Sequence, residues 1–160
     1  MRLLFIRFSS IGDIVFTTPA IRCAKQQIPG VEIHFLTKTS MKLVTEANPY
    51  IDQFHYFDKD ITATIASLKQ FKFDYIVDLH NNFRTFNIKQ ALGVPALTYK
   101  KLSIQKLLLT KLHINLMPQR HISERCVDTL ASLGVVNDGK GLDYFVPDTV
   151  QLKASDIPTA

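Results

Sequence analysis

The chain has 160 residues, a length typical of one domain or of one domain with a tail, and 46% of them are hydrophobic, which is enough for a sizeable core. No apolar run is long enough to span a bilayer, and Arg7 interrupts the short apolar run at the N-terminus, so we expect neither a membrane span nor a signal peptide but a cytoplasmic protein. The net charge of +5 favours an anionic partner.

Strand and helix patterns alternate in the first part of the chain. In chain order we expect a strand at residues 2–8, a helix at 13–28, a strand at 31–36, a short helix at 39–47 and a strand at 54–57. Because proline suits the first turn of a helix, Pro19 predicts that the regular part of the first helix begins near Thr18. Thr39 or Ser40 can cap the short helix.

The same alternation continues to the end of the domain. We expect a helix capped by Asp60 with one apolar stripe (Ile61, Ile65, Leu68, Phe71), a strand at 75–77, a helix at 84–92 and a strand at 94–99. A leucine-rich helix at 102–112 and a helix from Ile122 to Leu133, ended by Gly134, follow. Residues 148–160 are interpreted as a linker or tail.

This order of elements predicts an α/β fold, a Rossmann-like three-layer domain with a parallel sheet. The first strand is followed by a lone Gly12 rather than GxGxxG, so no NAD or FAD site is expected. The histidines lack ligand spacing with a nearby acid and no DxD pair occurs, so we expect no metal site. Cys23 and Cys126 fall on apolar helix faces, which predicts buried free thiols.

The corner at residues 9–13 is the first candidate site. It lies where the first strand turns into a helix, and ligands of open α/β sheets bind at the carboxyl ends of the strands. Asp13 either caps the helix by stabilising its N-terminus or acts on a bound hydroxyl group. Ser9, Ser10 and Gly12 either offer backbone amides to an anion such as a diphosphate or are small because the chain turns sharply.

A second polar loop follows the fourth predicted strand and is expected at the same edge of the sheet. It contains His80, Asn81 and Arg84 as candidate substrate-binding residues. Arginine can bind a phosphate or carboxylate through two parallel hydrogen bonds. In the alternative interpretation, His80 is packed in the fold and Arg84 pairs with Asp78.

Acidic residues are absent between Asp78 and Glu124, and this stretch carries seven cations: Arg84, Lys89, Lys100, Lys101, Lys106, Lys111 and Arg120. The stretch either creates a positive field that gathers an anionic partner or is a solvated face of ordinary lysines. Because the sequence contains no recognised nucleic-acid motif, nucleic acid is not expected as the partner.

The opening segment MRLLFIRFSSIGDIVFTTPAI resembles the N-terminus of glycosyltransferase family 9, the ADP-heptose:lipopolysaccharide heptosyltransferases and their relatives. Four further segments match in register: AKQQIPGVEIHFL, FDYIVDLHNNFRT, HISERCVDTLASLG and LDYFVP. The resemblance covers nearly the whole chain, to about Pro147. The first segment is fairly specific, and the others support it.

The resemblance implies that residues 1–147 are the N-terminal, acceptor-side half of a two-domain GT-B enzyme. It implies that Asp13 is the catalytic base, that the donor is a nucleotide sugar such as ADP-heptose, and that the acceptor is an anionic lipid-linked glycan. A C-terminal domain of the same enzyme, absent from this chain, is expected to bind most of the donor, so the isolated domain is expected to be inactive. The inner face of the bacterial inner membrane is the expected location. A stand-alone anion-binding module without catalysis is the alternative.

The chain departs from the family pattern at two places. Relatives commonly carry a histidine two or three residues after the acid, where this chain has Phe16, so no role for that histidine is transferred. They often have a glutamine–glycine pair and a lysine where this chain has His80, Asn81 and Arg84. The second departure suggests a donor or acceptor different from the best-known one.

Overall fold

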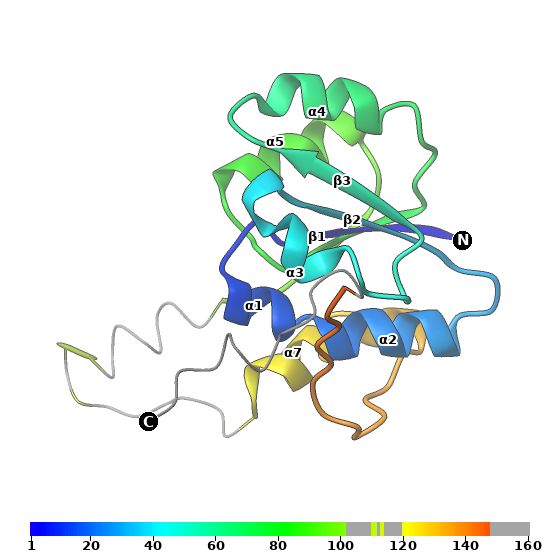
Figure 1. Ribbon diagram of the computed structural model, residues 1–160, viewed down its shortest axis with the longest axis vertical. Coiled ribbons are helices and arrows are strands. Elements are labelled where there is room, and N and C mark those ends of the chain that lie inside the picture. Colours follow the sequence, from blue (N-terminus) through cyan, green and yellow to red (C-terminus); the bar gives the residue numbers. More distant parts are fainter. Residues whose placement is uncertain (102–109, 112, 114–119, 148–160) are drawn as a thin grey trace, which may run out of the picture.

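Five parallel strands form the centre of the domain in the order β3-β2-β1-β4-β5 (Figure 1). The computed structural model describes residues 1–101, 110–111, 113 and 120–147. The strands are β1 (Arg2–Ile6), β2 (Glu32–Lys38), β3 (Gln53–Phe57), β4 (Tyr75–Asp78) and β5 (Ala96–Thr98). All five expected strands are therefore confirmed, with ends that differ by a few residues.

The helices cover both faces of this sheet. They are α1 (Ile11–Val15), α2 (Thr18–Gln27), α3 (Lys42–Thr45), α4 (Ile61–Leu68), α5 (Phe83–Leu92) and α7 (Ile122–Asp128). Figure 1 shows α4 and α5 on one face, with α2 and α7 on the other. The expected α/β fold with helices on both faces of a parallel sheet is thus confirmed.

Strand β1 shows why three layers form. Its side chains alternate between two apolar clusters: Leu3 and Phe5 pack with residues of α2 and α7, and Leu4 and Ile6 pack with residues of α4 and α5. All four side chains are fully buried, because successive residues of a strand point to opposite faces and both faces are covered. Cys23 and Cys126 belong to the first cluster as free thiols, as expected.

Helix ends follow their local signals at several positions. Asp60 caps α4 by accepting a hydrogen bond from the amide of Thr62 at 2.7 Å. Gly93 and Gly134 have φ of 65° and 76°, the left-handed conformation that glycine adopts without a Cβ penalty, and each ends a helical segment.

Two of the expected helices differ from the structure, and two expected segments lie essentially outside the described residues. The segment after β2 begins as a 3-10 helix at Thr39–Met41, so neither Thr39 nor Ser40 caps it from outside, because Lys38 precedes its first turn. The last predicted helix is shorter, since α7 ends at Asp128 and a separate 3-10 turn covers Ala131–Leu133. The expected helix at 102–112 and the tail at 148–160 fall essentially outside the described residues.

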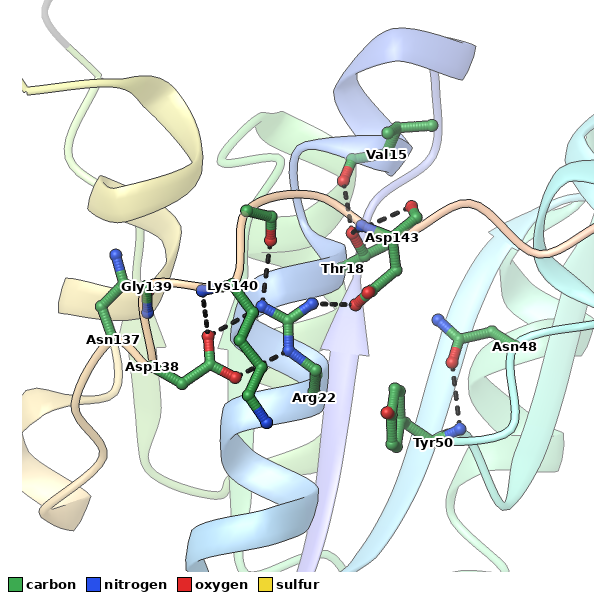
Figure 2. Close-up of polar contacts among 11 residues, drawn as sticks. Val15, Thr18, Arg22, Asn48, Tyr50, Asn137, Asp138, Gly139, Lys140 and Asp143 are labelled. Atoms are coloured by element: carbon green, nitrogen blue, oxygen red, sulfur yellow. Dashed lines mark hydrogen bonds and ion pairs between the residues drawn. The ribbon is translucent and has the colours of Figure 1, made fainter.

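A buried arginine ties the last described segment to α2 (Figure 2). Arg22 is 2% exposed, and its guanidinium binds both carboxylate oxygens of Asp138 at 2.8 Å, the carboxylate of Asp143 and the carbonyl of Gly141 at 2.9 Å. Thr18 adds two hydrogen bonds with the backbone of Asp143. Residues 138–143 are thus held against α2 by paired charges, and the acids hold the pKa of Arg22 above its ordinary value.

A second buried polar group lies between the sheet and α4. His34 on β2 is fully buried, and its ring stacks on that of His55 on β3. The Nε2 atom of His34 lies 2.7 Å from a Glu32 oxygen, and its Nδ1 atom lies 2.8 Å from Nε2 of His55. In the tautomers that fit these distances, Nε2 of His55 donates to Nδ1 of His34 and Nε2 of His34 donates to Glu32, so each contact is satisfied.

We expect this pair to make stability depend on pH. Burial, together with repulsion from His34, lowers the pKa of His55 from 6.5 to about 4. The unfolded chain therefore binds more protons than the folded one between these values, so the free energy of unfolding falls as the pH drops from 6.5 to 4. We expect a loss on the order of 1–2 kcal/mol, because one pKa unit corresponds to about 1.4 kcal/mol and His55, which keeps 9% of its surface exposed, is partly hydrated in the folded chain.

Urea unfolding at pH 7.0, 5.5 and 4.5 measures this loss. His55→Gln should flatten the curve without abolishing its slope, because His80 has a similarly lowered pKa. An equal free energy of unfolding at pH 7.0 and 4.5 in the unmodified chain would contradict the assignment.

Candidate functional site

The loops after β1 and β4 meet at the carboxyl edge of the sheet. Ile6 and Asp78 are partners in neighbouring strands, and the Leu79 amide donates to the Ile6 carbonyl at 3.1 Å. The corner at residues 9–13 and the loop at 79–82 therefore lie side by side, as the sequence predicted for two strands whose carboxyl ends share one edge.

Asp13 lies on the first turn of α1, with its carboxylate held at one oxygen. Oδ2 accepts hydrogen bonds from the amide and the hydroxyl of Ser10, at 3.2 and 3.0 Å, and forms an ion pair with Nη2 of Arg7 at 2.5 Å. Within the described part of the chain, no contact is made at Oδ1. The side chain is 37% exposed, and Oδ1 is its oxygen that keeps its hydrogen-bonding capacity for a ligand.

The charge state of Asp13 follows from these contacts. Partial burial raises its pKa, but the Ser10 hydrogen bonds and the positive charge of Arg7 outweigh burial and hold the pKa below 3.8. Asp13 is therefore a carboxylate at neutral pH. The bond from the Ser10 amide also shows that Asp13 caps α1, so its helix-capping role is real and is compatible with a second role at Oδ1.

Arg7 joins the two loops, and sequence reasoning assigned it no role. Its Nε atom donates to the Ser9 carbonyl at 2.9 Å, and its Nη1 atom donates to the Leu79 carbonyl at 2.6 Å. The available signal was a charged residue directly after four fully buried strand residues, a position where an arginine needs a partner.

The remaining residues of the first corner differ in whether their backbone groups already have a hydrogen-bond partner. The Ser10 amide is occupied by Asp13, and the Ser9 carbonyl is occupied by Arg7. Gly12 is exposed, and a Cβ added there would meet no heavy atom within 4 Å. Neither packing nor a positive φ requires glycine at this position, and the space around Gly12 is open.

The loop after β4 is organised by the fully buried Asp78. One of its oxygens accepts hydrogen bonds from the amides of His80 and Asn81, at 3.1 and 2.7 Å, and the other is paired with Lys89 at 2.8 Å. Arg84 does not pair with Asp78, so this part of the alternative is wrong: Arg84 lies exposed on the first turn of α5. Lys89 reaches Asp78 from the last turn of the same helix.

Asn81 and His80 have different environments in this loop. Asn81 adopts a φ of 50°, a conformation that asparagine tolerates better than most residues, and its side-chain amide donates to the Tyr99 carbonyl at 3.0 Å. His80 is half-buried, with its ring centroid 4.8 Å from that of Phe8. Burial lowers its pKa to about 4, helped by the charges of Arg7 and Lys101, so His80 is neutral at physiological pH.

A pocket of about 430 Å³ opens beside this loop, between β5 and α7. Its polar lining includes Tyr99, Lys100 and Arg125, and the Arg125 guanidinium lies 4.8 Å from the centre of the Tyr99 ring. Burial raises the pKa of Tyr99, and the charge of Arg125 opposes this rise. Arg125 comes from α7 and is distant in sequence from both loops, so the sequence did not single it out.

The described residues contain neither a metal-binding cluster nor a membrane-spanning helix. Across residues 1–101, 110–111, 113 and 120–147, no three histidine, cysteine or acidic side chains are grouped as a metal site would need. Over the same residues, every helix is too short or too polar to cross a membrane.

The sheet order and the two loops at its carboxyl edge define a Rossmann-like α/β domain with a polar site at the switch between β1 and β4. No family model matches the sequence, and no curated protein matches it. Solved structures do share the fold. A glycosyltransferase family 9 protein from Veillonella parvula DSM 2008 matches with a TM-score of 0.67 and 21% identity, over 89% of this chain and 44% of that one.

Two Escherichia coli enzymes are also similar. Heptosyltransferase WaaC with ADP matches with a TM-score of 0.67 and 19% identity, over 89% of this chain and 50% of that one. ADP-heptose lps heptosyltransferase II matches with a TM-score of 0.51 and 18% identity, over 59% of this chain and 29% of that one. This chain therefore spans at most about half the length of these proteins, and the family resemblance seen in the sequence is confirmed at the level of the fold.

Proposed function

We propose that this chain is the acceptor-side half of an inverting glycosyltransferase, with Asp13 as its catalytic base. The observation that supports this most directly is the position of the Asp13 carboxylate. It lies at the carboxyl end of the central strand, ionised, held at Oδ2 and open at Oδ1, in a fold shared with glycosyltransferase family 9 structures.

The proposed reaction uses this open oxygen. Oδ1 accepts the proton of an acceptor hydroxyl group while the hydroxyl oxygen forms a bond with the anomeric carbon of the donor sugar. The bond from that carbon to the nucleoside diphosphate breaks from the opposite face, and the diphosphate leaves with the electron pair, so the configuration inverts. Ser9, Ser10 and Gly12 border this site, and the open space at Gly12 allows close approach of the substrate.

The substrates we propose are ADP-heptose as donor and a lipopolysaccharide core or related anionic glycan as acceptor. A structure similar to this one is described as WaaC with ADP-2-deoxy-2-fluoro heptose. The anionic acceptor is supported by cations around the site: Arg84 is exposed on α5, and Lys100 and Arg125 line the neighbouring pocket. His80 and Asn81 would contact the substrate from the loop after β4. An acceptor carried by a lipid places the enzyme in the cytoplasm at the inner membrane surface.

This proposal divides the work between two domains, residues 1–147 and a C-terminal domain that binds most of the donor. We expect residues 1–160 to fold and yet to transfer no sugar, because the donor half of the cleft is missing and the site is completed only when both halves face each other. The two-domain protein should transfer the sugar from ADP-heptose to a deacylated, phosphorylated core acceptor.

A coupled assay for ADP release, run on the two-domain protein and on residues 1–160, tests whether catalysis needs both domains. Transfer by residues 1–160 alone, at the rate of the two-domain protein, would contradict it. A two-domain protein that binds the acceptor but releases no nucleoside diphosphate from any nucleotide sugar would favour the alternative, an anion-binding module without catalysis.

A further inference from the structure

We propose that Arg7 is the positioning residue of Asp13: its guanidinium holds one carboxylate oxygen and so presents the other, Oδ1, to the acceptor hydroxyl group. The inference rests on the proposed role of Asp13 as base, and it assigns a function to a residue outside the two loops that the sequence singled out.

Each nitrogen of the Arg7 guanidinium has a different partner. Nε binds the Ser9 carbonyl at 2.9 Å, Nη1 binds the Leu79 carbonyl at 2.6 Å, and Nη2 pairs with Oδ2 of Asp13 at 2.5 Å. Two of these partners belong to the corner after β1 and the third to the loop after β4. Arg7 therefore fixes the carboxylate relative to both loops that border the site.

This arrangement needs the planar guanidinium group of arginine. The three partners lie in three directions around one guanidinium, and a lysine ammonium is a single point charge on a flexible stem that cannot hold all three in a fixed geometry. The side chain is only 15% exposed, so its ion pair is screened less by solvent than the surface pairs of this chain. Arg7 also follows the fully buried strand β1 directly, which gives its backbone a rigid base.

The ionisable groups that face the pair come from three further elements. His80 lies in the loop after β4, Tyr99 follows β5 and Cys126 lies on α7, and the charges of both Arg7 and Asp13 act on all three. Arg7 is the cation that pairs directly with the Asp13 carboxylate. Without it, the carboxylate would keep only the Ser10 hydrogen bonds and could turn Oδ1 and Oδ2 around them.

The test compares Arg7→Lys and Arg7→Gln with the unmodified protein in two measurements. The first is the pKa of the Asp13 carboxyl group, from NMR titration of its carboxyl carbon in residues 1–160. Arg7→Gln should raise this pKa by about one unit because an opposite charge is lost, and Arg7→Lys should raise it less. Arg2→Lys is the matched control, since Arg2 pairs with Glu32 at the opposite end of the same strand and should leave Asp13 unchanged.

The second measurement is the pH–rate profile of the two-domain protein. Arg7→Lys should lower kcat at least tenfold with KM for donor and acceptor within about twofold, and Arg7→Gln should shift the acidic limb upward with the pKa of Asp13. An unchanged pKa in Arg7→Gln, or an unchanged kcat in Arg7→Lys while Asp13→Asn is inactive, overturns the role of Arg7. Full activity of Asp13→Asn instead overturns the proposed function, whatever Arg7 does.

Discussion

Replacing Asp13 by asparagine should lower kcat of the two-domain protein by roughly 10²–10⁴-fold, the usual contribution of a positioned general base. Asparagine has nearly the same size and can still accept a hydrogen bond from the Ser10 amide, so the cap of α1 is retained. It cannot accept the proton of an acceptor hydroxyl group. The loss should therefore appear in kcat, with little change in KM.

Two controls separate the chemical role of Asp13 from its structural role. Asp58→Asn makes the same substitution at an exposed acid that directly follows β3 on the same edge of the sheet, and it should leave kcat within about twofold. Thermal unfolding reports the capping role, because loss of a cap costs about 1 kcal/mol. Equal kcat in Asp13→Asn and in the unmodified protein would refute the assignment. An equal loss of kcat in Asp58→Asn would show that the loss of any negative charge at this edge of the sheet lowers kcat.

The fold could be predicted from the sequence because its signals are local. Each strand is a short apolar run, each helix has its own spacing, and Asp60, Gly93 and Gly134 mark helix ends within one turn of the residues they affect. The start of the segment at Thr39 was misjudged because threonine and serine are good caps in general, and only the path of the chain decides whether they lie before the first turn or inside it.

Part of the site could also be predicted, because some of its signals are local in the sequence. Asp13 and His80 each follow an apolar strand, and the rule for carboxyl ends of parallel strands brings their loops together. The partners of these residues were not predicted, because they are distant in sequence: Arg7 binds Leu79, and Lys89 rather than the nearer Arg84 pairs with Asp78. Such pairs depend on which side chains face each other across the folded sheet, and no spacing pattern encodes that.

The second large expected effect concerns stability and the buried Arg22. Arg22→Met keeps much of the buried alkyl chain but leaves Asp138 and Asp143 without their cation and the Gly141 carbonyl without its donor. Breaking a buried ion pair by removing one partner costs about 3–5 kcal/mol, and the two acids, at 13% and 22% exposed, recover part of this by hydration. We therefore expect the free energy of unfolding to fall by about 2–4 kcal/mol.

The loss should begin where residues 138–143 lie against α2. Figure 2 shows Asp138 and Asp143 on either side of the Arg22 guanidinium, so its removal releases both contacts at once. Amide hydrogen exchange should then speed up in residues 138–145 before it does in the central strands. Lys25→Met is the matched control on the same helix: its pair with Asp52 is 28% and 38% exposed, so it should cost about 1 kcal/mol or less. Equal losses in the two variants, or exchange that speeds up uniformly, would show that Arg22 does not anchor this segment.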